Sequence, residues 1–72
     1  MDIRRQLGLN MQRLRRQKGW SQEELAFEAE LHRTYVSGVE RGVRNPTVMI
    51  VARIARALGV APAVLLGDNR NR

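Results

Sequence analysis

Hydrophobic residues recur at every third or fourth position along most of the chain, which is the spacing of amphipathic helices. The first such segment runs from about Asp2 to Lys18, and its apolar stripe consists of Ile3, Leu7, Met11 and Leu14. A second segment begins at Ser21, and three more cover about residues 31–42, 47–58 and 62–66. The segment at 47–58 is expected to bury Val48, Val51, Ala55 and Leu58. Because no stretch alternates as a strand does, the pattern predicts an all-α protein of five helices.

The ends of these helices are marked by residues with special roles. Glycine closes helices in the left-handed conformation, and one glycine follows each of four segments: Gly19, Gly42, Gly59 and Gly67. Ser21 and Glu24 have the spacing of a capping box, with Trp20 and Leu25 placed as a hydrophobic staple. Pro62 suits the first turn of the last helix. We therefore expect one domain over residues 1–67, followed by a flexible polar tail at residues 68–72.

One of the exposed helix faces has an unusual composition. In the segment at 31–42 the apolar side consists of Leu31, Tyr35, Val36 and Val39. The opposite side carries Arg33, Thr34, Ser37 and Arg41, with Gly38 at its edge. A solvated face would favour strong helix formers such as Glu, Lys and Ala, so helix propensity does not explain these residues. This face is the first candidate for a binding surface.

Net charge favours nucleic acid as a partner. Thirteen basic and seven acidic residues give the 72-residue chain a net charge of +6, and every basic residue except Lys18 is arginine. The planar guanidinium fork binds phosphate and guanine in a way that lysine cannot. The alternative is that the charge serves solubility or reflects a bias in arginine coding.

Several functional classes have little support. The chain has no cysteine and only one histidine, so we expect no disulfide, no metal, no cofactor and no catalytic residue. We therefore expect no enzyme and no small-molecule ligand. No apolar run is long enough to span a bilayer and the first residues lack the core of a signal peptide, which favours a cytoplasmic protein without membrane contact.

The second and third helices are separated by only about three residues, which favours a steep crossing of the helix-turn-helix type. The stretch SQEELAFEAELHRTYVSGVERGVRNPT, followed by IARALGV, resembles the phage repressor and Cro type of helix-turn-helix, the XRE family. The resemblance covers about Leu7 to Leu66, and RTYVSGVER is especially similar to the controller proteins of restriction-modification systems. It implies a compact, lambda-repressor-like five-helix bundle that regulates transcription by binding DNA.

The resemblance also implies which residues contact DNA. It places the third helix in the major groove, with four residues at the base edges: Arg33, Thr34, Ser37 and Gly38. Arg33 can form two hydrogen bonds to guanine, and the Thr34 methyl group can contact thymine. The positions expected to contact phosphates are Ser21, Gln22, His32, Tyr35, Arg41, Arg44 and Asn45. For His32 an ordinary cap, and for Tyr35 a packing role, are the alternatives.

Two further features concern the scaffold. Arg15 and Glu40 match positions at which the family forms an ion pair between the first and third helices. Glu30 occupies a turn position at which relatives often have a glycine with positive φ. A non-glycine residue in that conformation costs about 1 kcal/mol or more.

Apolar residues stand at exposed positions where relatives carry polar ones: Met49, Ile50, Ala63 and Val64. Such patches usually mark an interface, so we expect a homodimer that binds a partly palindromic double-stranded operator. The alternative is a rearranged core that buries these residues within one chain. A rival function is an antitoxin or adaptor module whose main partner is another protein, which would use the same patch.

Overall fold

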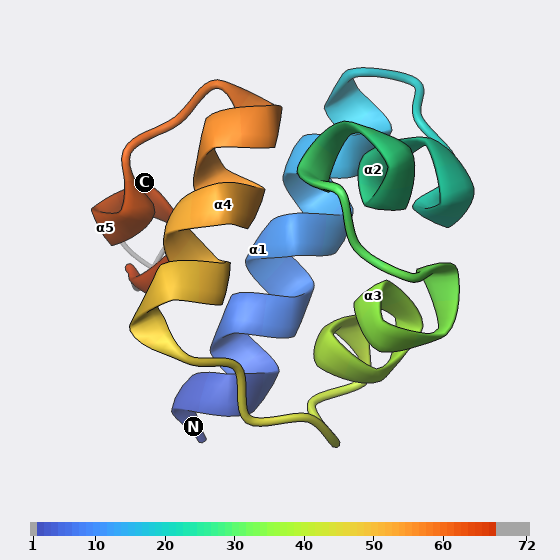
Figure 1. Cartoon of the computed structure of the whole chain (residues 1–72). Helices are drawn as coiled ribbons and strands as arrows, with labels where there is room; N and C mark the ends of the chain where they lie inside the picture. Colours follow the sequence, from blue (N-terminus) through green and yellow to red (C-terminus); the bar gives the residue numbers. More distant parts are fainter. Residues whose placement is uncertain (1, 68–72) are drawn as a thin grey trace.

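The chain folds into five helices without a strand in the part that the structure describes. The structure is a computed structural model that describes residues 2–67, so the tail expected at 68–72 lies outside it. The helices, in chain order, are α1 (Ile3–Gln17), α2 (Gln22–Ala29), α3 (Arg33–Glu40), α4 (Val48–Leu58) and α5 (Pro62–Leu66) (Figure 1). The predicted all-α class is confirmed.

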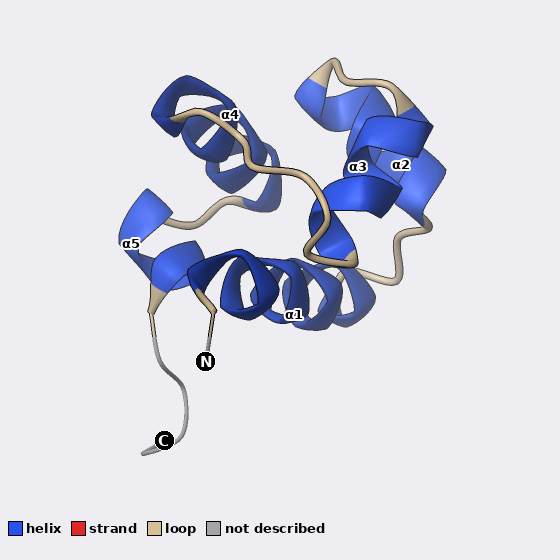
Figure 2. Ribbon diagram, turned by 90° about the horizontal axis from the view of Figure 1, so that it is seen from below, coloured by secondary structure: helices blue, strands red, loops and turns tan. Residues whose placement is uncertain are grey.

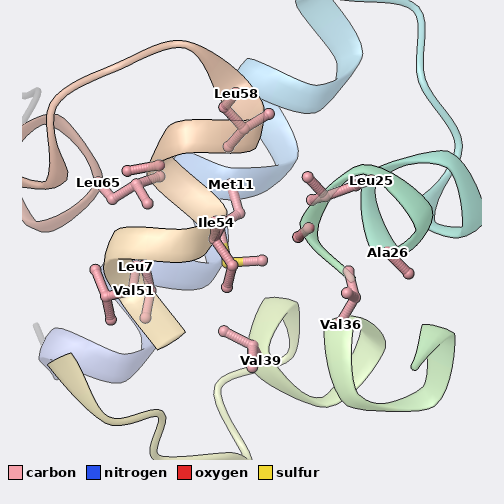
Figure 3. Close-up of a cluster of buried hydrophobic side chains, with 12 residues drawn as sticks. Leu7, Met11, Leu25, Ala26, Val36, Val39, Val51, Ile54, Leu58 and Leu65 are labelled. Atoms are coloured by element: carbon pink, nitrogen blue, oxygen red, sulfur yellow. The ribbon is translucent and has the colours of Figure 1, made fainter. Parts of the chain in front are cut away.

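The longest helix, α1, links two parts of the bundle. It packs against α3 and α5, while α4 packs against α2 and α5, and α2 against α3 (Figure 2). Side chains from all five helices meet in one core, with Met11, Leu25, Val36, Ile54 and Leu65 among its fully buried members (Figure 3). The helix-turn-helix formed by α2 and α3 is therefore held on a common core with α4 and α5.

The expected burial of α4 is right at three positions and wrong at the fourth. Val51, Ala55 and Leu58 are buried, but Val48 is 84% exposed. Val48 is the first residue of α4 and extends past the edge of the core. It lines an open, mostly apolar groove of about 230 Å³ together with Ile3 and Leu66.

Side-chain caps stand at the starts of α1 and α2, and the sequence predicts the second of them. The Asp2 carboxylate accepts hydrogen bonds from the side chain and the backbone N–H of Arg4, and these bonds lower the pKa of Asp2 below its ordinary value. At α2 the Ser21 Oγ accepts the Glu24 N–H (3.0 Å), while Glu24 Oε1 accepts the Ser21 N–H (2.8 Å), so the capping box is confirmed.

Glycine closes three helices but not the last one. Gly19, Gly42 and Gly59 have φ of 71°, 78° and 75°, whereas Gly67 has an extended conformation (φ −77°, ψ 158°), so its predicted left-handed closure is wrong. The reason is that α1 caps α5 with a side chain. The buried Asn10 Nδ2 donates to the carbonyl oxygens of Leu65 (2.7 Å) and Gly67 (3.0 Å).

The turn of the helix-turn-helix has the geometry expected for it. Glu30 ends α2 in the left-handed region (φ 59°, ψ 45°), and three residues separate α2 from α3. The N–H of Leu31 donates to the Ala26 carbonyl at 2.8 Å, which closes the turn. His32 then acts as the N-cap position of α3, so the helix is shorter at both ends than the periodic segment at 31–42.

Candidate nucleic-acid interface

The start of α3 exposes two of the four residues assigned to base edges. Arg33 and Thr34 are exposed, and neither side chain makes a hydrogen bond to the protein within residues 2–67. Ser37, one turn further along, is half-buried. Behind this edge Val36 and Val39 are fully buried in the core. The core therefore holds α3 in place while a guanidinium and a hydroxyl remain available at its outer edge.

The fourth residue, Gly38, is buried instead of lying on the exposed face. A Cβ placed on Gly38 would lie 2.6 Å from Cγ of Arg44, so the Arg44 side chain covers this part of the helix. The guanidinium carbon of Arg44 lies 5.7 Å from the centroid of the Tyr35 ring. Contact of Gly38 with a base edge remains a prediction, and Arg44 lies on the surface that such a contact would use.

The start of α2 has polar groups that could meet a phosphate. The capping box uses the N–H groups of Ser21 and Glu24, so the N–H groups of Gln22 and Glu23 have no acceptor within the helix. The Gln22 side chain is already engaged, since its Nε2 donates to Glu40 Oε1 at 3.0 Å. A phosphate at this end would therefore meet the backbone N–H groups of Gln22 and Glu23 and the second N–H of the Gln22 side-chain amide.

The remaining phosphate candidates lie around the two ends of α3. His32 is exposed at the N-cap position and its side chain forms no capping hydrogen bond. Arg41 and Asn45 are exposed after the helix, whereas Tyr35 is half-buried and packs against the core. The packing role that was the alternative for Tyr35 is confirmed. Its contact with a phosphate stays a prediction, as do the contacts of the other three.

A buried ion pair fixes α3 to α1, as the family resemblance implied. Arg15 donates through Nε to Glu40 Oε2 (2.8 Å) and through Nη2 to Glu40 Oε1 (3.1 Å). The third nitrogen, Nη1, donates to the carbonyl oxygen of Trp20 at 2.8 Å. Breaking a buried pair by removing one partner is strongly destabilising, because the other charge is left uncompensated. The pair therefore sets the position of α3 relative to α1.

Two contacts of Glu40 were not predicted from the sequence. One is the hydrogen bond from Gln22 to Glu40, which ties the first turn of α2 to the ion pair. The other is the close packing of Gly8, where a Cβ would overlap with the carbonyl oxygen of Glu40. A glycine within a helix costs about 1 kcal/mol relative to alanine, so a glycine at this position indicates that another part of the chain packs closely against α1.

The residues assigned to a dimer interface are exposed to different degrees. Met49 is 77% and Val64 40% exposed, and Ala63 is exposed, but Ile50 is half-buried because it packs against the core. Met49 lines a hollow between α2 and α4 that also contains Arg53. The sequence reasoning missed Val48 and Leu66, which are exposed on the same pair of helices. Contact of these residues with a second chain stays a prediction.

Other functional classes find little in the described residues. Across residues 2–67, no cluster of three or more histidine or acidic side chains is arranged to hold a metal ion. None of the five helices combines the length and the apolar character needed to cross a membrane, judged over the same residues.

Comparison with known proteins identifies the architecture built around α2 and α3. The family model described as Helix-turn-helix (HTH_3) matches residues 11–65, most of the chain. The chain belongs to this helix-turn-helix family. Its DNA-binding transcription regulators include repressors and restriction-modification controller proteins, so the resemblance noted in the sequence is confirmed.

Two relatives match most of this chain, one by its sequence and one by its crystal structure. Control protein C.BamHI of Bacillus amyloliquefaciens is 47% identical over 66 residues, which cover 90% of this chain and 82% of that protein. The crystal structure of the hypothetical transcription factor NHTF from Neisseria has a TM-score of 0.94 at 48% identity, covering 99% of this chain and 82% of that one.

A third relative was solved together with DNA. The controller protein C.Esp1396I, as a tetramer in complex with its natural 35-base-pair operator, has a TM-score of 0.82 at 34% identity. The match covers 90% of this chain and 86% of that one. The two chains therefore share the same helix-turn-helix fold.

Proposed function

We propose that this protein is a transcriptional regulator that binds a specific double-stranded DNA sequence as a homodimer, with α3 in the major groove. The observation that carries the proposal is the outer edge of α3. Arg33 and Thr34 are exposed there without partners in the described part of the chain, while the buried pair of Arg15 and Glu40 holds the helix from behind. A helix whose polar edge is unpaired and whose position is rigid suits recognition of base edges.

Each exposed group has a chemical role in this proposal. The Arg33 fork donates to O6 and N7 of a guanine, the Thr34 methyl contacts thymine, and Ser37 can donate or accept. Arg41 and Arg44 neutralise phosphates after the helix. The N–H groups at the start of α2 hold a phosphate on the other side, since that helix end carries a partial positive charge. Specificity thus comes from α3, and most of the affinity comes from its surroundings.

A homodimer is supported by two observations. The controller protein C.Esp1396I assembles as a tetramer on its operator, and this chain exposes Met49 and Val64 on α4 and α5. A two-fold dimer sets its recognition helices about 34 Å apart, one turn of DNA, and therefore reads a partly palindromic site. With such a site at its own promoter, the concentration of the protein would control how much of that operator is occupied.

The experiment that tests the proposal compares two arginines. We expect Arg33→Ala to cost about 1–3 kcal/mol per half-site and to relax the preference at one base pair, because it removes a base contact. We expect Arg44→Ala to weaken specific and unrelated duplexes about equally, because it removes a phosphate contact. Binding is measured on the site selected from random duplex DNA, on that site altered at the presumed guanine, and on unrelated DNA.

The outcome distinguishes a residue that recognises a base from one that contacts only the DNA backbone. If Arg33→Ala loses the same free energy on all three duplexes, α3 does not read bases through this residue. If the wild-type chain shows no preference for any selected duplex but copurifies with an unrelated protein, the adaptor or antitoxin function replaces the one proposed.

A further inference from the structure

The chain turns back on α3 directly after the helix ends. The N–H of Gly42 donates to the Val39 carbonyl and the N–H of Val43 to the Gly38 carbonyl, each at 3.0 Å. With Gly42 in the left-handed region (φ 78°), these two bonds form a Schellman motif. The motif reverses the chain so that Arg44, two residues after the glycine, lies beside the last turns of the helix.

The Arg44 side chain occupies the space that a side chain at position 38 would fill. A Cβ on Gly38 would lie 2.6 Å from Cγ and 3.3 Å from Nε of Arg44, and the first distance is too short for any real Cβ contact. Beyond this contact the guanidinium carbon lies 5.7 Å from the Tyr35 ring centroid, within the range of a cation–π interaction. Gly38 and Tyr35 therefore form two sides of a seat for Arg44.

We propose that Gly38 is a positioning residue: its missing side chain seats Arg44 on α3, and Gly38 acts on DNA through Arg44 instead of facing a base. The proposal rests on the proposed DNA-binding function and deepens it. An arginine that already lies in one conformation loses less rotamer freedom when it binds a phosphate, so the seat raises affinity by preorganisation. With alanine at position 38, the stem of Arg44 must shift away from the helix, and in the proposal this shift moves the guanidinium away from the Tyr35 ring.

A double-mutant cycle tests this coupling on DNA. Gly38→Ala, Arg44→Ala and the double variant are compared for affinity to the selected duplex. We expect Gly38→Ala to remove most of the affinity that Arg44→Ala removes, and to change affinity by less than about twofold when Arg44 is already alanine. If Gly38→Ala alone lowers the affinity about tenfold, the coupling between the two positions is at least about fivefold. Thr34→Ala serves as the matched control on the same helix, and its loss should add to that of Arg44→Ala.

Nuclear magnetic resonance of the free protein provides a readout that needs no DNA. A side chain held over an aromatic ring shows upfield shifts of its protons, so we expect such shifts for the Arg44 side chain in the wild type and their loss in Gly38→Ala. Tyr35→Phe keeps the ring and should keep the shifts. The melting temperature of Gly38→Ala should not be lower than that of the wild type, because alanine has the higher helix propensity.

The proposal fails if Gly38 contacts DNA by itself. An equal loss for Gly38→Ala with and without Arg44 would show such a direct contact and would overturn the positioning role. Full affinity for Gly38→Ala, or unshifted Arg44 protons in the wild type, would also overturn it. If the wild-type chain binds no duplex specifically, the proposed function fails, whereas the resonance shifts still report whether the seat exists.

Discussion

At the scale of single residues, Glu30 is a site of stored backbone strain. It is the one non-glycine residue with positive φ in residues 2–67, at φ 59°. The left-handed conformation costs a non-glycine residue about 1–2 kcal/mol, although glycine returns part of that gain through its greater freedom in the unfolded chain. We expect Glu30→Gly to raise the free energy of unfolding by about 0.5–1 kcal/mol and the melting temperature by a few degrees.

The control for that prediction is Glu30→Ala, which keeps a Cβ in the same backbone conformation. It removes the carboxylate without relieving the strain, so thermal unfolding should show little or no rise. A lower melting temperature for Glu30→Gly would mean that the Glu30 side chain, and not the backbone, decides the stability of this turn.

The residue scale also shows where prediction from the sequence stops. The left-handed turn at Glu30 and the pair of Arg15 and Glu40 could be predicted, because motif positions carry their geometry. The burial of Gly38 could not, because it depends on where the chain goes after α3 and on which side chain returns. Periodicity places a residue on a face of its helix but does not say what covers that face.

At the scale of elements, α5 depends on α1 for its stability. A helix of five residues is too short to be stable alone, and two α1 side chains bind its last carbonyl groups. Asn10 Nδ2 donates to the Leu65 carbonyl in a buried setting (2.7 Å), while Gln6 Nε2 donates to the Leu66 carbonyl at the surface (2.8 Å). Removing a buried donor leaves an unsatisfied carbonyl, which costs about 1–3 kcal/mol.

We therefore expect Asn10→Ala to lower the free energy of unfolding by about 1–3 kcal/mol and to speed amide hydrogen exchange in α5 more than in α3. Gln6→Ala is the matched control, since the same kind of bond at an exposed position is replaced by water, and its loss should stay below about 1 kcal/mol. Equal losses for both variants would show that Asn10 does not hold α5 through its buried bond.

Helix ends could be predicted from the sequence where the signal is local, and the end of α5 shows where it is not. Capping residues and glycines are local signals, so the starts of α2 and α5 and three of the four glycine closures were correct. Gly67 does not close α5 in the left-handed conformation, because Asn10 reaches it from 57 positions earlier in the chain. A partner so distant leaves no trace in the local pattern.

At the scale of the whole molecule, charge is distributed unevenly relative to the proposed DNA surface. Arg33, Arg41 and Arg44 lie on or directly after α3, whereas Glu23 and Glu28 are exposed on α2. Glu23 lies in the first turn of α2 and Glu28 near its end, so these carboxylates repel phosphates along the helix, and a phosphate at its start is held by backbone N–H groups against that repulsion. The net charge of +6 therefore overstates the number of cations that meet DNA.

This distribution sets the expected dependence of binding on salt. If Arg41, Arg44 and about one further cation per subunit meet phosphates, a dimer neutralises about six of them, and the log–log slope of the association constant against salt is near −5. The slope is obtained from titrations of the selected duplex at several salt concentrations, with sedimentation to establish that two subunits bind. Arg44→Ala should make the slope shallower by about one unit for each phosphate that is no longer neutralised. A slope near zero would exclude this mode of binding, while one near −10 would mean that arginines on other helices, such as Arg13 or Arg53, also reach the DNA.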